Sequence, residues 1–210
     1  MSEIYFSTRL NSFALGQGRK YPEKAVDTLD LIEIASTVKG LNALEINYPE
    51  HFLSHNVEEI SVALKKASLE VKGIQLRWPA PKFANGGFSN HDATIRHDAI
   101  EMVAEAIKLA KALKTDHVLL WPAHDGYEYP LQMNYIDGWR WFKEALQKLA
   151  DIDPDIRISI EYKPAEPRGR TLLNTTGAVM KMIADVARQN VGVTLDFGHL
   201  LMARENPAQS

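Results

Sequence analysis

Short apolar runs alternate with segments of helical spacing along most of the chain, and this alternation restricts the fold more than any other feature. Such alternation is what repeated strand–helix units produce. Several runs are almost continuously apolar, as expected for parallel strands covered by helices. We predict six strands: Ile4 to Thr8, Ala43 to Asn47, Val71 to Leu76, His117 to Trp121, Arg157 to Glu161 and Val191 to Asp196.

The clearest helical pattern runs from about Ala93 to Lys114, where apolar residues such as Ile100, Val103 and Ile107 recur at intervals of three and four. That stripe should pack against a sheet. No low-complexity linker or internal repeat divides the chain. We therefore predict one α/β domain over residues 1–210.

Composition and charge exclude several classes of partner. The net charge is -3 and the isoelectric point about 6.2, so no positive field attracts nucleic acid or an anionic membrane. The N-terminus lacks a basic region followed by an apolar run, and no apolar segment reaches the roughly 20 residues that span a bilayer. The absence of cysteine excludes disulfides and zinc–thiolate sites and is consistent with a reducing compartment. We predict a cytoplasmic protein whose metal, if any, is held by carboxylates and histidine.

The connections that follow the predicted strands are long, especially residues 77–91 and 122–137. Parallel α/β folds place their sites at the carboxyl ends of the strands, so these loops and the strand ends beside them are where chemistry is expected. Neither GxGxxG nor GxxxxGK[ST] occurs, so the sequence contains no dinucleotide or P-loop phosphate motif.

The fifth strand ends with a carboxylate and an ammonium two residues apart, Glu161 and Lys163. Alternation along a strand places both side chains on one face. Burying such a pair is costly, so a pair that faces a barrel mouth indicates function. A simple surface ion pair remains the alternative.

The sixth strand ends in Asp196, and His199 follows three residues later. Carboxylate oxygens with imidazole suit Mn²⁺, Mg²⁺ or Co²⁺ and also accept Zn²⁺. The alternative is that Asp196 only caps the next helix.

The fourth strand ends at Trp121, with Asp125 and several aromatic residues close behind. Aromatic rings beside polar groups suit a sugar, whose CH face stacks while its hydroxyls need hydrogen-bond partners. We predict that Trp121, Asp125 and Trp78 bind the substrate. The alternative for Trp121 is a core position.

Four segments between residues 83 and 208 resemble the xylose-isomerase-like TIM barrels, which include xylose isomerase and rhamnose isomerase. The most specific is Glu161 to Gly169, which is similar to the E-x-K-P-x-E-P-R-G segment of that family. The other three are Gly86 to Asn90 followed by Asp92 and Arg96, Trp121 with Gly126 five positions on, and Gly192 to Asp196 followed by Gly198, His199, Met202 and Ala203.

The resemblance implies roles for individual residues. Glu161 and Asp196 would be bridging or structural metal ligands, and His199 a ligand of a second, catalytic metal. Lys163 would polarise the carbonyl oxygen of the substrate. His51 is the candidate for the histidine that assists ring opening, with His55 second. Xylose isomerase has Glu where this chain has Asp196, whereas rhamnose isomerase and sugar epimerases of the superfamily have Asp.

The resemblance also implies a (β/α)8 barrel that is incomplete in this sequence. A closed barrel needs about 250 residues, and the sequence supplies about six βα units, without the seventh and eighth strands. We expect the first and sixth strands to be unpaired edges. The remaining metal ligands of the family lie on the last strands, so we expect this sequence to be a truncated form of a longer protein.

The leading functional hypothesis is a metal-dependent sugar isomerase that uses a two-metal hydride shift. The alternatives are a ketose epimerase of the same superfamily and a catalytically silent sugar-binding fragment. Cleavage of damaged DNA is disfavoured by the net charge and by Lys163. The partner would be a small sugar, and the resemblance is compatible with a homo-oligomer.

Overall fold

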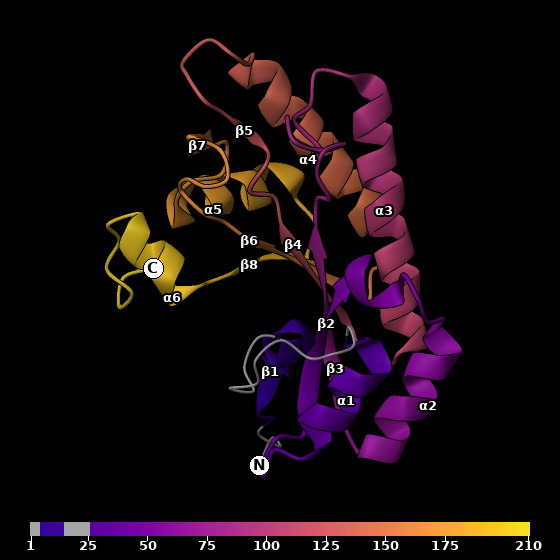
Figure 1. The fold of residues 1–210 in the computed structure, drawn as a ribbon. Coiled ribbons are helices and arrows are strands. Elements are labelled where there is room, and N and C mark those ends of the chain that lie inside the picture. Colours follow the sequence, from indigo (N-terminus) through magenta and orange to yellow (C-terminus); the bar gives the residue numbers. More distant parts are fainter. Residues whose placement is uncertain (1–4, 15–25) are drawn as a thin grey trace.

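A computed structural model of the chain describes residues 5–14 and 26–210. Six parallel strands form one curved sheet in the order β1-β2-β3-β4-β6-β8, which is the order of the sequence (Figure 1). The strands are β1 (Ser7–Arg9), β2 (Ala43–Tyr48), β3 (Glu70–Arg77), β4 (His117–Trp121), β6 (Arg157–Glu161) and β8 (Val191–Thr194). This confirms the prediction of an incomplete α/β barrel whose first and last strands, β1 and β8, are its edges.

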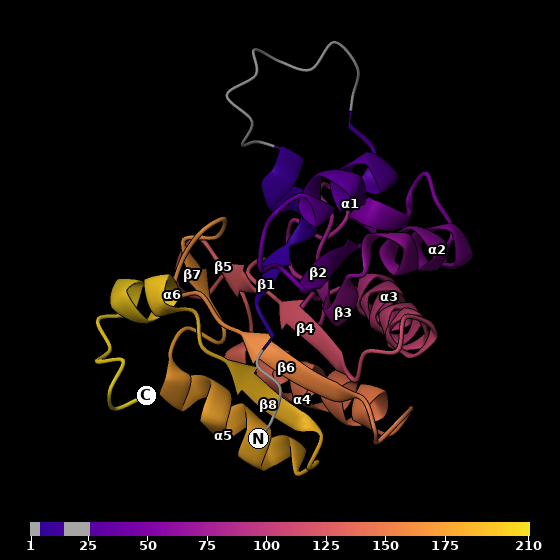
Figure 2. The ribbon, with the colours of Figure 1, turned by 90° about the horizontal axis from the view of Figure 1, so that it is seen from below.

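Helices cover the convex side of the sheet (Figure 2). They are α1 (Thr28–Ser36), α2 (Val57–Ala67), α3 (Ala93–Ala112), α4 (Tyr135–Ala150) and α5 (Thr176–Val186). The short α6 (Phe197–Met202) instead follows the carboxyl end of β8, and the 3-10 turns η1 (Leu10–Ala14) and η2 (Glu50–Phe52) follow β1 and β2. The predicted helix from Ala93 is confirmed, and its residues Val103 and Ile107 are buried in the core between α3 and the sheet. Asn or Asp side chains cap α1, α2, α3 and α4 at their first turns, which fixes where these helices begin.

Residues on the convex face of the strands form the apolar core. Ile46, Ile74, Leu120 and Ile160 are fully or almost fully buried there. Their neighbours in the strands alternate to the concave side, which is largely polar. On that side His117 hydrogen-bonds Ser159 at 2.7 Å, and Ser159 hydrogen-bonds Thr194 at 2.6 Å, so three strands are linked across the interior.

Two short strands in the long loops form a second, antiparallel sheet. β5 (Gly126–Tyr127) pairs with β7 (Arg170–Thr171). Any Cβ at Gly126 would collide with the carbonyl oxygen of Arg170, so this close approach requires glycine. The pair ties the loop after β4 to the loop after β6, above the carboxyl ends of the main strands (Figure 1).

The first predicted strand is displaced. It was expected from Ile4 to Thr8, whereas β1 begins at Ser7 and ends at Arg9, and Ile4 lies outside the described residues. The sixth was expected to reach Asp196, but β8 ends at Thr194 because Asp196 already belongs to the next helix as its N-cap.

Candidate metal and sugar site

Register places the candidate residues at one edge of the sheet. Glu161 at the end of β6 pairs with Thr194 at the end of β8, and Asp196 follows two residues later. Because alternate residues of a strand face the same side, Glu161 and Asp196 are brought to the concave side on neighbouring strands. His199 follows on the first turn of α6.

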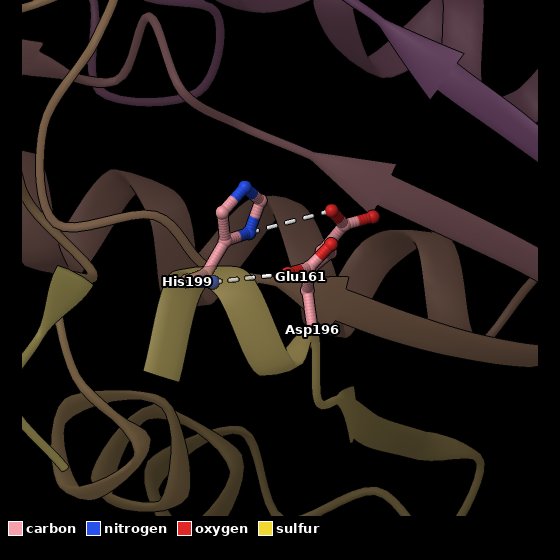
Figure 3. Close-up of side chains that lie close together, drawn as sticks. All are labelled: Glu161, Asp196 and His199. Carbon is pink, nitrogen blue, oxygen red and sulfur yellow. Dashed lines mark hydrogen bonds and ion pairs between the residues drawn. The ribbon is translucent and has the colours of Figure 1, made fainter. Parts of the chain in front are cut away.

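Glu161, Asp196 and His199 form a cluster of three possible metal ligands (Figure 3). One ligand atom from each lies within 4.8 Å of the others, and all three side chains are half-buried. His199 Nδ1 lies 3.4 Å from Glu161 Oε1. The expectation that the two carboxylates are neighbours across the strands is confirmed.

Burial and the mutual repulsion of the two carboxylates make Glu161 costly to ionise. Burial first, and then the neighbouring charge of Asp196, raise the pKa of Glu161 to about 7. Burial also lowers the pKa of His199, which favours the neutral imidazole that a metal binds. His199 Nδ1 is buried without a hydrogen-bond partner, since its contact with Glu161 lacks hydrogen-bond geometry. Two close carboxylates and an unpartnered imidazole nitrogen therefore fit a divalent cation.

Asp196 also caps a helix, which was the alternative role considered for it from the sequence. It is the N-cap of α6, and its Oδ1 accepts a hydrogen bond from the His199 backbone N–H at 3.0 Å. The cap fixes the start of α6 and thereby the position of His199. Capping and membership of the cluster are compatible, because a carboxylate has further lone pairs to offer.

Lys163 lies beside the cluster with its side chain largely buried. Its Nζ forms an ion pair with Glu166 at 2.9 Å and lies 5.9 Å from the centre of the Trp121 ring. The sequence predicted an ion pair between Lys163 and Glu161, and in the structure Lys163 instead pairs with Glu166. The reason is local: the chain turns after β6, which brings residue 166 back to residue 163.

Trp121 is half-buried at the end of β4, and two cations, Arg77 and Lys163, lie 5.0 and 5.9 Å from the centre of its ring. In the pairing of β3 with β4, Trp121 lies opposite Arg77, the last residue of β3. Its role in substrate binding stays a prediction. Arg77 was missed by the sequence reasoning, although its place two residues after Gln75 on the polar face was the available signal.

Trp78 and Asp125, also predicted to bind substrate, are buried and bonded to each other. Trp78 Nε1 donates to Asp125 Oδ2 at 2.6 Å. Asp125 Oδ1 accepts from Gly87 N, Ser89 N and Ser89 Oγ at 2.6–3.1 Å. Burial raises the pKa of Asp125, and these donated hydrogen bonds oppose the rise. Asp125 therefore holds the loop after β3 in place, and Trp78 packs against Phe83 and Phe88.

Asp125→Ala is expected to destabilise the protein by about 2 kcal/mol or more, because it leaves buried donors without an acceptor. The change should appear as a lower urea midpoint at an unchanged slope of the unfolding free energy. Asp155→Ala, at an exposed position near β6, is the control and should change little. Equal midpoints for the two variants would contradict the structural role of Asp125.

His51 is buried in η2, just after the carboxyl end of β2. Its Nδ1 accepts a hydrogen bond from the Asn47 backbone N–H at 2.8 Å, so the neutral ring carries its proton on Nε2. Burial lowers the pKa of His51 and favours this neutral form. Nε2 is buried without a hydrogen-bond partner. A role in ring opening stays a prediction. His55 instead contacts Asp27 and Glu59 near the first turns of α1 and α2.

The sequence model described as "Xylose isomerase-like TIM barrel" matches residues 32–210. The chain belongs to this family. Among curated proteins, the xylose isomerase of Thermus thermophilus is 28% identical over 156 residues, covering 71% of this chain and 40% of that protein. The xylose isomerase of Thermus caldophilus is 30% identical over 131 residues, which cover 60% of this chain and 34% of that protein. This xylose isomerase-like chain thus spans less than half the length of either relative.

Solved structures confirm the fold of this xylose isomerase-like chain. A D-allulose 3-epimerase from Methylomonas sp. aligns with a TM-score of 0.77 at 19% identity, covering 98% of this chain and 67% of that one. A 3-keto-D-glucoside 4-epimerase from E. coli aligns with a TM-score of 0.74 at 16% identity, and the alignment covers 99% of this chain and 73% of that one. Within the described residues, no helix combines the length and hydrophobicity needed to cross a membrane.

Proposed function

We propose that this protein is a metal-dependent sugar isomerase that interconverts an aldose and a ketose. One observation carries the proposal: Glu161, Asp196 and His199 converge with a buried, unpartnered imidazole nitrogen, and Lys163 is near enough for its charge to act on His199. The similarity of the chain to two xylose isomerases supports the proposal of an isomerase.

Glu161, Asp196 and His199 would hold a divalent cation. Their mixed oxygen and nitrogen donors suit Mn²⁺, Mg²⁺ or Co²⁺ and accept Zn²⁺. When bound, the cation supplies a Lewis acid that holds adjacent sugar oxygens and stabilises negative charge.

The residues of the chain perform the remaining tasks. Trp121 presents a ring face on which the CH side of the open sugar can stack. Lys163 donates a hydrogen bond to the carbonyl oxygen, and its ion pair with Glu166 holds the ammonium in position. In the reaction, the C2–H bond breaks and a C1–H bond forms as hydride moves. The proton of the C2 hydroxyl is lost and the C1 oxygen gains one, so the carbonyl moves to C2.

An aldose deuterated at C2 tests this reaction in the full-length protein loaded with Mn²⁺. We expect the label to be retained at C1 of the ketose, because a hydride shift never releases the hydrogen to solvent. Mass spectrometry of the product measures the retention. Reaction without Mn²⁺ is the control and should give no product.

A ketose epimerase of the same superfamily is the alternative, favoured by Asp196 in place of the Glu of xylose isomerase. Epimerisation would proceed by proton transfer, and the label would wash out into water. A silent sugar-binding protein would give no product and would bind sugar in calorimetry without metal. Either result would contradict the isomerase proposal.

A further inference from the structure

Arg77 is the last residue of β3, and its side chain is half-buried on the concave side of the sheet. Its guanidinium carbon lies 5.0 Å from the centre of the Trp121 ring, to which the strands bring it by register. A ring face can stabilise a cation, but it leaves the in-plane N–H donors of the guanidinium free to bind an anion.

Among the described residues, Arg77 has no carboxylate within 4.0 Å and donates no side-chain hydrogen bond. Arg168, a more buried arginine in the same protein, shows the usual solution. It pairs with Glu128 at 2.6 Å and donates to Ala84 O, Asn85 and Gln132. A half-buried guanidinium is costly without such partners, so the donors of Arg77 that no described residue accepts from suit an anionic group of a ligand.

The surroundings of Arg77 add positive charge. The pKa of Arg77 is lowered, mainly by burial and to a smaller extent by repulsion from Arg9 at the end of β1. Glu161 and Glu50 oppose this effect, but neither forms an ion pair with it. Lys163 lies 5.9 Å from the same Trp121 ring. Two cations therefore lie near the ring on which the sugar is proposed to stack.

The position of Arg77 relative to the cluster sets which part of a substrate it reaches. β3 lies two strands from β6, which is about 10 Å at the usual spacing of neighbouring strands. An open-chain sugar whose carbonyl end lies beside Lys163 and Glu161 would extend past Trp121 toward Arg77. The far end of the sugar would then meet the free guanidinium.

We propose that Arg77 binds an anionic group, a carboxylate or a phosphate, at the end of the substrate remote from the carbonyl. The substrate class is thus an acidic sugar: a uronate or a sugar phosphate. The planar fork of arginine matches both groups with two parallel hydrogen bonds. This inference rests on the proposed function, because it takes the sugar to lie across Trp121.

Matched sugars test the inference in the full-length protein with Mn²⁺. The probes are the neutral aldohexose, its uronate and its 6-phosphate in the gluco, galacto and manno series, with affinity measured by calorimetry. We expect one acidic form to bind at least about tenfold more tightly than its neutral counterpart, as a charge-assisted pair provides. The uronate and phosphate arms identify which anion is bound.

Arg77→Gln is expected to remove that preference while changing the affinity for the neutral sugar and for Mn²⁺ by less than about twofold. Arg77→Lys should retain part of the preference for the acidic sugar, because lysine keeps the positive charge but lacks the two parallel donors of the guanidinium. Arg140→Gln is the matched control, since Arg140 is an exposed arginine on α4 paired with Asp137. It should leave every affinity unchanged.

Three results would overturn the inference. Tight binding of neutral sugars with no gain from either anion would reject it while leaving the isomerase proposal standing. Loss of Mn²⁺ affinity in Arg77→Gln without loss of anion preference would show that Arg77 is only a counter-charge for Glu161. Binding of no sugar, neutral or acidic, would reject this inference and the proposed function together.

Discussion

Lys163→Met is expected to lower kcat by about 10²-fold or more while Mn²⁺ still binds. An ammonium that donates to the carbonyl oxygen stabilises charge that grows in the transition state, which is worth several kcal/mol in a partly dehydrated site. Lys163 lies beside the cluster, and its pair with Glu166 does not involve the candidate ligands. Steady-state kinetics measures the loss, and calorimetry with Mn²⁺ measures the retained binding.

Lys181→Met is the control, because Lys181 is an exposed lysine on α5 that also forms an ion pair, with Asp185. It should leave kcat unchanged. Loss of the Lys163 pair should itself cost less than about 1 kcal/mol of stability, since Glu166 is largely exposed. An unchanged kcat for Lys163→Met on every sugar converted would reduce Lys163 to a structural ion-pair partner.

The sequence predicted the parallel strands best where apolar residues were continuous. β4 and β6 begin and end at the predicted residues. β5 and β7 were missed because two-residue strands have no periodicity, and their pairing joins positions 126 and 171 in two separate loops. Gly126 carried the only signal, since a close backbone approach there excludes any side chain.

The candidate ligands were predictable because register follows from strand order. Once β6 and β8 are neighbours, Glu161 and Asp196 must meet. The polar concave face was also visible in the sequence as alternating polar residues, for example Gln75 and Arg77, but several of the runs were interpreted as almost continuously apolar. Side-chain partners were harder to predict: the buried clamp from Asp125 depends on a loop contact across 36 residues or more.

Glu161→Gln is expected to stabilise the metal-free protein at pH 8 by up to about 3 kcal/mol. The pKa of Glu161 is raised from 4.5 to about 7 because the carboxyl is buried beside Asp196. The folded state therefore holds its proton more tightly than the unfolded state, and stability falls as pH rises from 4.5 through 7. Above pH 7 the full cost of the buried charge, about 3 kcal/mol, applies to the wild type and not to the variant.

Urea unfolding at pH 5 and pH 8 measures this difference, which should be large at pH 8 and small at pH 5. Addition of Mn²⁺ should reverse the order, because a cation bound by the folded state stabilises the wild type by mass action. In the variant, a neutral amide replaces a carboxylate ligand and that stabilisation should be largely lost. Glu101→Gln, at an exposed position on α3, should respond to neither pH nor Mn²⁺ differently from wild type. Equal stabilisation of wild type and Glu161→Gln by Mn²⁺ would show that the cation binds elsewhere, and the cluster would then be only an acidic helix cap.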